Sequence, residues 1–364
     1  MKILLSGGGT LGSVTPLLAI VEALKSRSSP TQEFEFYWLG TRRGIEKELV
    51  KEQNIRFKPI FNGKLRRYFS LRNFIDPFFI VLGFFQSLIV VFRFKPDIVL
   101  SAGSFISVPV VWAGWLLGRP IIIHQQDLRP SLANRLTSFC ATKITVTFEK
   151  SISDFPREKV VWTGNPTRAE IFRGDRARAE TNFGLEKDLA TALFMGGGTG
   201  AKSLNQLIAQ IVPELASFCQ IIHLTGQGKS VEIKWPNNSL ASRYHQYEFL
   251  TNELKDAYAA SSIVVCRAGL GALTELANLA KPLILIPLPN THQEDNADYL
   301  KSKKAVLVLD QKNLTAEILF SEIEKLLSDE NLQAELSQNI AQAMKKHAAS
   351  QIIDLIFKIK HGRV

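Results

Sequence analysis

Cysteine, paired aspartates and long apolar runs are scarce in this 364-residue sequence, and each absence excludes a class of protein. Its three cysteines, Cys140, Cys219 and Cys266, lie far apart and in no metal-ligand spacing. A scaffold held by disulfides is therefore excluded, and a reducing compartment is expected. No Asp-x-Asp triplet and no cluster of His and Cys occurs, so we expect no metal site.

An apolar run, Phe78–Phe92, is interrupted only by one glycine and two polar residues. At 15 residues it falls short of the length of about 20 that a membrane span needs. A buried helix is the simplest interpretation, and a helix that touches a membrane surface is the alternative. The N-terminal run 1–7 is too short for a signal peptide and enters glycines, so it is interpreted as a strand.

The basic excess lies in the first part of the chain. The formal net charge is +10, and residues 1–160 hold 22 Lys/Arg against 12 Asp/Glu, whereas residues 161–364 hold 22 of each. Between positions 56 and 74 no acidic residue occurs, and a basic patch with apolar neighbours is formed by Arg56, Lys58, Lys64, Arg66, Arg67, Arg72, Leu65, Tyr68, Phe69, Leu71 and Phe74. This mixture suits an anionic membrane surface, at about 1 kcal/mol per basic residue. A solvated basic loop would look the same, and no motif indicates nucleic acid.

Short apolar runs alternate with helical stretches, which indicates an α/β protein with parallel sheets covered on both faces. The length predicts two domains. The first should hold strands at Lys2–Ser6, Phe34–Leu39, Asp97–Ser101, Pro120–His124, Lys143–Phe148 and Val160–Thr163. The second should hold Thr191–Met195, Gln220–Leu224, Ile263–Cys266, Leu283–Ile286 and Ala305–Leu309. With 164–166 as linker, we expect domains 1–163 and 164–345, and a C-terminal helix in 346–364 that is a candidate to pack back on the first domain.

The two halves begin alike, since LLSGGGT at Leu4–Thr10 resembles LFMGGGT at Leu193–Thr199. Each is a strand, a glycine loop and a helix start, an arrangement that brings backbone N–H groups to an anion beyond the strand end. A tight structural turn is the alternative for either loop. The first loop matches the dinucleotide pattern G-x-G-x-x-G, but the second strand ends at 38–43 without a carboxylate, so no nicotinamide cofactor is expected. A diphosphate held without a metal would rely on amides and basic side chains, as in metal-independent sugar transferases.

Motifs along nearly the whole chain resemble those of the MurG family, in the same order. They are GGGTLGSVTPLLAI, SAGSFISVPVVWAGWLLGRPIIIHQQ, GNPTR, GGGTGAKSLNQ, CRAGLGALTELANLAKPLILIPLP and HQEDNA. The resemblance implies a GT-B fold, with two Rossmann-like domains whose parallel sheets face a central cleft. It implies an inverting hexosyltransferase without cofactor, which moves N-acetylglucosamine from UDP-GlcNAc to a lipid-linked muramyl-pentapeptide acceptor in peptidoglycan biosynthesis. Its place would be peripheral, on the cytoplasmic face of the cell membrane.

The same resemblance implies the roles of individual residues. Glu275 would accept hydrogen bonds from the uridine ribose, Arg168 would neutralise phosphate charge, and Gln293 would contact the transferred sugar. The donor side would further include Thr10, Gly12, Gly197, Gly198, Thr199, Gly200, His292 and Asn296, and the acceptor side Gln125, Gln126 and Asn134. The simpler alternatives are a helix-cap carboxylate for Glu275, a surface arginine for Arg168 and a loop amide for Gln293.

The chain departs from the family pattern where the attacking hydroxyl must lose its proton. Ser13 stands where the family usually has a histidine, and the family's HEQN is here HQQD, with Gln125 in place of the glutamate. A general base is worth about 10²–10⁴ in rate, and neither serine nor glutamine is a base at neutral pH. Asp127 is the first candidate to have taken over this role, and His124 is the second.

Three other functions stay open at this point. A slow or altered relative could act on another membrane lipid acceptor, and a silent relative could bind UDP-sugar without consuming it. A sugar-nucleotide epimerase of the same fold would need no lipid.

Overall fold

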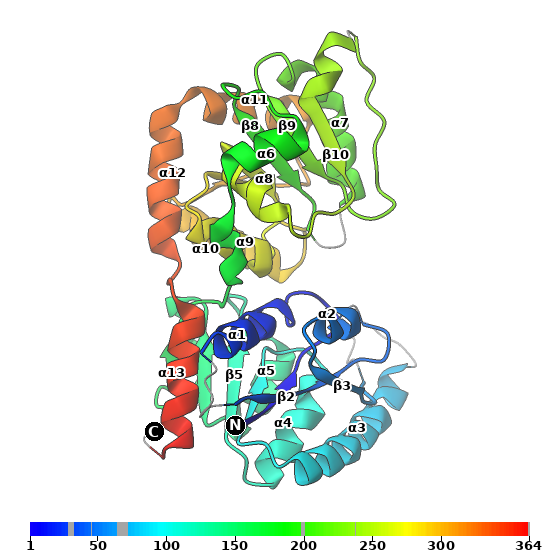
Figure 1. Ribbon diagram of the computed structural model, residues 1–364, viewed down its shortest axis with the longest axis vertical. Helices are drawn as coiled ribbons and strands as arrows, with labels where there is room; N and C mark the ends of the chain where they lie inside the picture. Colours follow the sequence, from blue (N-terminus) through cyan, green and yellow to red (C-terminus); the bar gives the residue numbers. More distant parts are fainter. Residues whose placement is uncertain (28–32, 45, 64–71, 198–200, 237, 363–364) are drawn as a thin grey trace. The chain divides into compact units, whose positions relative to one another are not determined.

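The computed structural model describes residues 1–27, 33–44, 46–63, 72–197, 201–236 and 238–362. The chain forms two compact units, Met1–Arg168 together with Lys345–Val364, and Ala169–Met344 (Figure 1). The division falls at 168/169, where the sequence had suggested 163/164, and the C-terminal segment belongs to the first unit.

The first unit is built on a parallel sheet of seven strands in the order β3-β2-β1-β4-β5-β6-β7. The strands are β1 (Lys2–Ser6), β2 (Glu35–Gly40), β3 (Arg56–Pro59), β4 (Ile98–Ser101), β5 (Ile121–Gln125), β6 (Lys143–Val146) and β7 (Val160–Trp162). The sequence did not predict β3, whose basic residues had been assigned to the membrane patch. Charged side chains are usual on a short edge strand, because they discourage pairing with another chain.

Two apolar clusters cover the two faces of this sheet. The helices are α1 (Thr15–Lys25), α2 (Glu46–Glu52), α3 (Arg72–Phe94), α4 (Ser107–Leu116), α5 (Leu132–Thr137) and α13 (Ala348–Lys360), with short 3-10 helices η1 (Ser138–Cys140) and η2 (Glu149–Asp154). One cluster joins α1 and α13, which lie side by side in Figure 1, to the sheet through fully buried side chains such as Ile352 and Ile356. The C-terminal helix is thus part of the core of the first unit.

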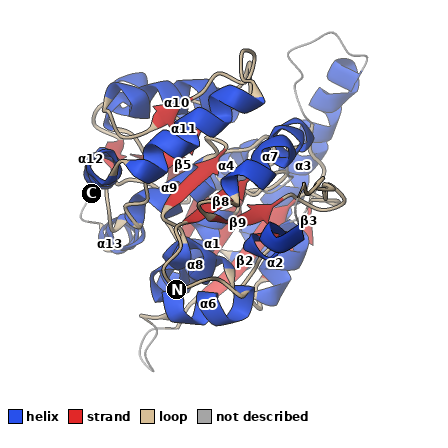
Figure 2. Cartoon of the chain, turned by 90° about the horizontal axis from the view of Figure 1, so that it is seen from above, coloured by secondary structure: helices blue, strands red, loops and turns tan. Residues whose placement is uncertain are grey.

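The second unit repeats this architecture with six parallel strands in the order β10-β9-β8-β11-β12-β13. They are β8 (Thr191–Met195), β9 (Gln220–Leu224), β10 (Tyr244–Tyr247), β11 (Ile263–Cys266), β12 (Leu283–Leu285) and β13 (Leu307–Val308), and Figure 2 shows β8 beside β9 in red. The helices are η3 (Ala169–Arg173), α6 (Arg176–Phe183), α7 (Lys202–Leu215), η4 (Asn238–Arg243), α8 (Leu254–Ala260), α9 (Leu270–Asn278), α10 (His292–Ser302), α11 (Ala316–Ser328) and α12 (Glu330–Ala343). The predicted α/β class with two parallel sheets is confirmed.

The expectation that the apolar run forms a buried helix is wrong. The run lies in the 23-residue helix α3, of which Ile75–Phe94 is long and apolar enough to cross a membrane by length and composition. One side packs on the unit, where Ser87, Val90, Val91 and Phe94 are buried. The opposite side carries an exposed apolar stripe, each side chain 50–67% exposed, made of Ile75, Phe78, Val81, Phe85, Ile89 and Phe92. Only one side of the apolar run is therefore covered by the protein.

Candidate functional site

Each sheet has one point at which the strand order reverses, between β1 and β4 in the first unit and between β8 and β11 in the second. Ligands of open α/β sheets bind beyond the carboxyl ends of the strands at such points. The two glycine loops follow β1 and β8, so each leaves its sheet beside the switch point. Both loops are therefore candidate ligand sites of their own units.

The first glycine loop is largely closed by hydrogen bonds within the protein. The N–H of Gly8 donates to Oγ of Ser13 (3.1 Å), and the N–H of Gly9 donates to Oε2 of Glu46 (3.2 Å). The Ser104 hydroxyl donates to the carbonyl of Gly8 (2.7 Å). Ser13 is buried and also lies within hydrogen-bond distance of the carbonyls of Gly8 and Thr10, so its hydroxyl shapes the loop. At the surface of this loop Thr10 is exposed and Gly12 half-buried.

Glu46, at the start of α2, is a fully buried carboxylate that the sequence analysis did not single out. Its Oε1 accepts from both the backbone N–H (2.7 Å) and the hydroxyl of Thr41, at the end of β2. A Cβ atom at Gly8 would lie 2.3 Å from Oε1. This carboxylate connects the end of β2 to the first glycine loop, and its close packing requires a glycine at position 8.

The expected acceptor-side residues lie at the end of β5 (Gln125), directly after it (Gln126) and in α5 (Asn134), and their side-chain amides hold the loop between these elements. Nε2 of Gln125 donates to the carbonyls of Asp127 (2.7 Å) and Arg129 (2.9 Å), while its Oε1 accepts from Nδ2 of Asn134 (2.7 Å). Nε2 of Gln126 donates to the carbonyl of Ala102 (3.2 Å). Gln125, Gln126 and Asn134 are all buried, so this loop is held in one conformation by its own side chains.

His124 is buried, and each of its ring nitrogens lies within hydrogen-bond distance of another side chain. Nδ1 lies 2.9 Å from Oγ1 of Thr145, and Nε2 lies 2.9 Å from Oδ1 of Asn165. Burial lowers the pKa of His124 to about 4, so the ring is neutral at physiological pH. Since an amide oxygen only accepts, Nε2 carries the proton. This geometry favours a structural role for His124, which lies in β5, whereas Asp127, on the loop after β5, is half-buried.

At the switch point of the second unit, Gly197 is exposed and has a φ of 83°, a conformation that favours glycine. Gly198, Thr199 and Gly200 lie outside the described residues. Arg267, directly after β11, is buried and donates from Nη1 to the carbonyls of Ile286 (2.8 Å) and Pro287 (3.4 Å). Arg267 belongs to the CRAG motif, but the sequence alone indicated no role for it. Its guanidinium connects the ends of β11 and β12.

Glu275 lies in the second half of α9, whose N-cap is Gly269, so the helix-cap alternative for Glu275 is wrong. Only 8% of the residue is exposed, and Oε2 accepts from the hydroxyl of Tyr258 (3.1 Å). Tyr258 belongs to the neighbouring helix α8 and is completely buried. The Glu275 carboxylate therefore accepts a hydrogen bond from a buried phenol that no sequence pattern indicated.

The HQEDNA motif begins α10, next to the same switch point. His292 is exposed, and Oε1 of the half-buried Gln293 accepts from the N–H of Leu288 (3.0 Å). Asn296 is fully buried and donates from Nδ2 to the carbonyl of Ala268 (3.4 Å). Asn296 thus fixes the loop between β11 and α9. Arg168 is half-buried and ends the N-terminal segment of the first unit.

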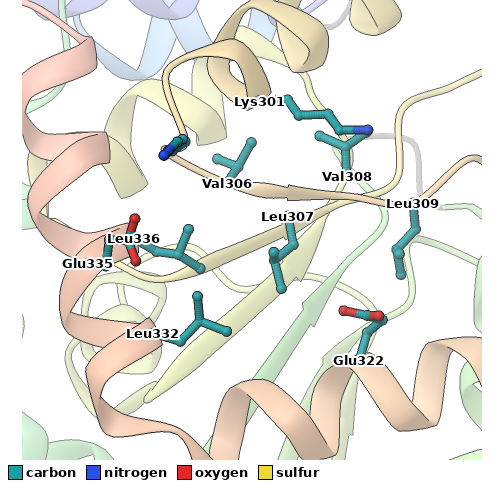
Figure 3. Close-up of a pocket in the computed structure, with 10 residues that line it drawn as sticks. Lys301, Val306, Leu307, Val308, Leu309, Glu322, Leu332, Glu335 and Leu336 are labelled. Carbon is teal, nitrogen blue, oxygen red and sulfur yellow. The ribbon is translucent and has the colours of Figure 1, made fainter.

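One cavity of about 380 Å³ in the second unit is lined by none of the expected site residues. It lies along β13, two strands away from β11. Its lining comes from β13 and its flanks and from α10, α11 and α12, as Figure 3 shows. The cavity is therefore separate from the switch point.

Comparisons with known proteins agree with this arrangement. Residues 3–146 match the glycosyltransferase family 28 N-terminal domain, and residues 191–352 match the C-terminal domain of that family. The UDP-N-acetylglucosamine–N-acetylmuramyl-(pentapeptide) pyrophosphoryl-undecaprenol N-acetylglucosamine transferase 2 of Bacillus anthracis is 35% identical over 98% of this chain and 97% of its own. The transferase of that name from Clostridium kluyveri is 36% identical over 99% of both chains.

The chain belongs to the MurG family. The crystal structure of Acinetobacter baumannii MurG superposes with a TM-score of 0.73 at 25% identity, covering 98% of this chain and 99% of that one. The GT-B fold and the family that the motifs indicated are confirmed. Of the residues expected on the donor side, Gly197 follows β8, Glu275 lies on α9, and His292, Gln293 and Asn296 lie on α10, whereas Thr10, Gly12 and Arg168 belong to the first unit. The departures from the MurG pattern fall after β1, at Ser13, and at the end of β5, at Gln125 and Asp127.

Proposed function

We propose that this protein transfers N-acetylglucosamine from UDP-GlcNAc to the C4 hydroxyl of undecaprenyl-pyrophosphoryl-MurNAc-pentapeptide. The observation that carries the proposal is similarity to transferases of this name over nearly the whole length of both chains. The hydroxyl oxygen attacks the anomeric carbon from the face opposite the diphosphate. The bond from that carbon to UDP breaks, the hydroxyl proton passes to a base, and a β-linked disaccharide forms.

The donor belongs at the switch point of the second unit. Glu275 would accept from the ribose hydroxyls, and the loop from Gly197 to Gly200 would bring backbone N–H groups to the diphosphate. Arg168 would add positive charge as the leaving group departs, so that no metal is required. Gln293 would contact the transferred sugar, with Asn296 holding the loop beside it.

We assign the general base to Asp127. The hydroxyl of Ser13 is engaged with Gly8 and Thr10, and the ring of His124 is buried between Thr145 and Asn165. Neither group is placed to take a proton from a bound hydroxyl. Asp127 lies on the loop after β5 and carries a carboxylate, a group that commonly serves as a general base.

The membrane surface would be met by α3 and its neighbours. The exposed apolar stripe continues onto Trp115 and Leu116 of α4 and Phe139 of η1, which line an apolar cavity of about 250 Å³ with Phe84 and Trp112. Lys159 donates to the carbonyl of Phe139 (2.9 Å), and Arg93 lies in the last turn of α3. Apolar side chains bordered by basic ones suit an anionic bilayer. Of the basic patch, Lys64, Arg66 and Arg67 lie outside the described residues, as do the side chains of Arg72 and Phe74 at the start of α3.

The proposal is tested by UDP release from UDP-GlcNAc, with and without a soluble analogue of the muramyl-pyrophosphoryl lipid. Acceptor-dependent release supports the transferase. UDP release that requires a different lipid acceptor would indicate a transferase that makes another glycolipid. Binding of UDP-GlcNAc without UDP release, whichever acceptor is added, would indicate a silent relative. Formation of an epimeric UDP-sugar without acceptor would indicate an epimerase.

A further inference from the structure

Glu275 is an unusual carboxylate because it is almost completely buried and still expected to meet a ligand. Its helix α9 packs through Leu273, Leu276 and Ala277, all buried. A flexible glutamate side chain in such a place loses rotamer freedom, and a second group must fix its orientation. The hydroxyl of Tyr258 does this through its hydrogen bond to Oε2.

Tyr258 comes from a helix that is itself tightly anchored. On α8, Asp256 forms an ion pair with Arg178 and accepts from the N–H of Asp175 (2.9 Å). At the other end of the helix, Nζ of Lys281 donates to the carbonyls of Ala259 (3.3 Å) and Ser261 (2.7 Å). Helix α8, which carries the phenol, is consequently joined to α6 and to the turn between α9 and β12.

We propose that Tyr258 is a positioning residue that orients the Glu275 carboxylate for two neighbouring hydroxyls of a nucleoside sugar. This inference rests on the proposed function, in which Glu275 meets the ribose. A carboxylate offers about four acceptor positions, and a phenol that occupies one on Oε2 prevents rotation of the group. The carboxylate is then pre-oriented before the donor arrives, which lowers the ordering cost of binding. Tyr258, completely buried, acts only through Glu275.

The test compares UDP-GlcNAc with its 2′-deoxyuridine analogue as donors, using KM and kcat for each. In the unaltered protein the ribose donor should have the lower KM. Tyr258→Phe should raise the KM for UDP-GlcNAc by about 5- to 10-fold, the upper part of the range for the net loss of a typical hydrogen bond, and leave kcat within about twofold. The KM for the deoxy donor should change less, so that the preference for ribose shrinks. A loss that arises only from general destabilisation would raise both KM values together.

Tyr244→Phe is the matched control, because it also removes a tyrosine hydroxyl from the second unit. That hydroxyl lies on the edge strand β10, within 3.2 Å of Oε1 of Gln246. It should leave the ribose preference unchanged. A Tyr258→Phe variant that behaves as Tyr244→Phe does would overturn the inference.

Glu275→Gln separates this inference from the proposed function. If Glu275→Gln keeps the full ribose preference, Glu275 does not meet the ribose, and its proposed contact with the donor fails together with the role of Tyr258. If Glu275→Gln loses the preference while Tyr258→Phe retains it, only the role of Tyr258 is refuted. Should Tyr258→Phe fail to fold, Glu275→Asp carries the test, since it keeps the charge but withdraws the carboxylate from the phenol. Retained preference in Glu275→Asp would then refute the inference.

Discussion

Replacing Phe85 on the apolar stripe of α3 with serine should weaken attachment to anionic vesicles by a calculable factor. Full burial of a phenylalanine side chain is worth about 1.5–3 kcal/mol. Phe85 is 56% exposed, so moving its exposed part from water into a bilayer is worth about 0.8–1.7 kcal/mol. The partition coefficient should therefore fall roughly 4- to 17-fold, because every 1.4 kcal/mol is a factor of ten.

Sedimentation with vesicles that contain anionic phospholipid measures this partition coefficient directly. Phe172→Ser is the matched control, because Phe172 is 57% exposed but lies in η3 of the second unit. Raising the salt concentration should weaken the contribution of the basic residues and leave the ratio between the unaltered protein and Phe85→Ser unchanged. Equal losses in Phe85→Ser and Phe172→Ser, or no loss in either, would refute α3 as the membrane-facing surface.

Three further changes probe the first unit. Asp127→Asn should lower kcat at least 100-fold while the dissociation constant of UDP stays the same, and an unchanged kcat would remove Asp127 from the mechanism. Glu46→Gln places an NH₂ group against a backbone N–H and should lower the free energy of unfolding by about 1–3 kcal/mol. Denaturant titration measures this loss, and Glu48→Gln, at an exposed position of the same helix, is the control. The free energy of unfolding should also fall between pH 6.5 and pH 4, because the unfolded chain protonates His124 near 6.5 whereas the fold lowers its pKa to about 4. The loss of unfolding free energy across this pH range is about 3 kcal/mol. In His124→Gln, the pH dependence of the unfolding free energy, measured by thermal denaturation, should lack this contribution.

The strands could be predicted where the chain is buried on both sides. β1, β8, β9 and β11 have the bounds that the sequence suggested, and β8 is buried at every position. The edge strands β3 and β10 were missed because their residues are charged or polar and mostly half-buried, so they form no apolar run. The other two edge strands, β7 and β13, were predicted because their residues are apolar, so the local signal is the apolar run and not the position in the sheet.

Helix α3 shows a different limit of sequence reasoning. Its composition is apolar on the buried and on the exposed side, so no polar face indicates which side the protein covers. The covered side is shown by the buried Ser87, Val90, Val91 and Phe94 and by Gly83, where a Cβ would lie 2.1 Å from the carbonyl oxygen of Phe61. The exposed stripe could not be separated from a buried helix by periodicity alone.

The glycine loops could be located from the sequence, whereas the groups that support them could not. Glu46 resembles an ordinary acidic residue in the first turn of a helix, a frequent position because of the helix dipole. Tyr258 resembles an ordinary core aromatic. Each acts on a loop or carboxylate that is distant in sequence, 37 residues for Glu46 and Gly9 and 17 for Tyr258 and Glu275. Such contacts follow from tertiary packing and leave no local pattern.

The fold places a carboxylate behind the backbone amides of the first glycine loop. In the first loop the N–H of Gly9 already donates to the carboxylate of Glu46, and the N–H of Gly8 donates to Ser13. A phosphate brought to the same amides would compete with these acceptors and meet a negative charge at close range. A carboxylate behind the loop instead suits a neutral hydroxyl that must lose a proton nearby. This arrangement disfavours the first loop as a site for the donor diphosphate and favours it as a site for the attacking sugar.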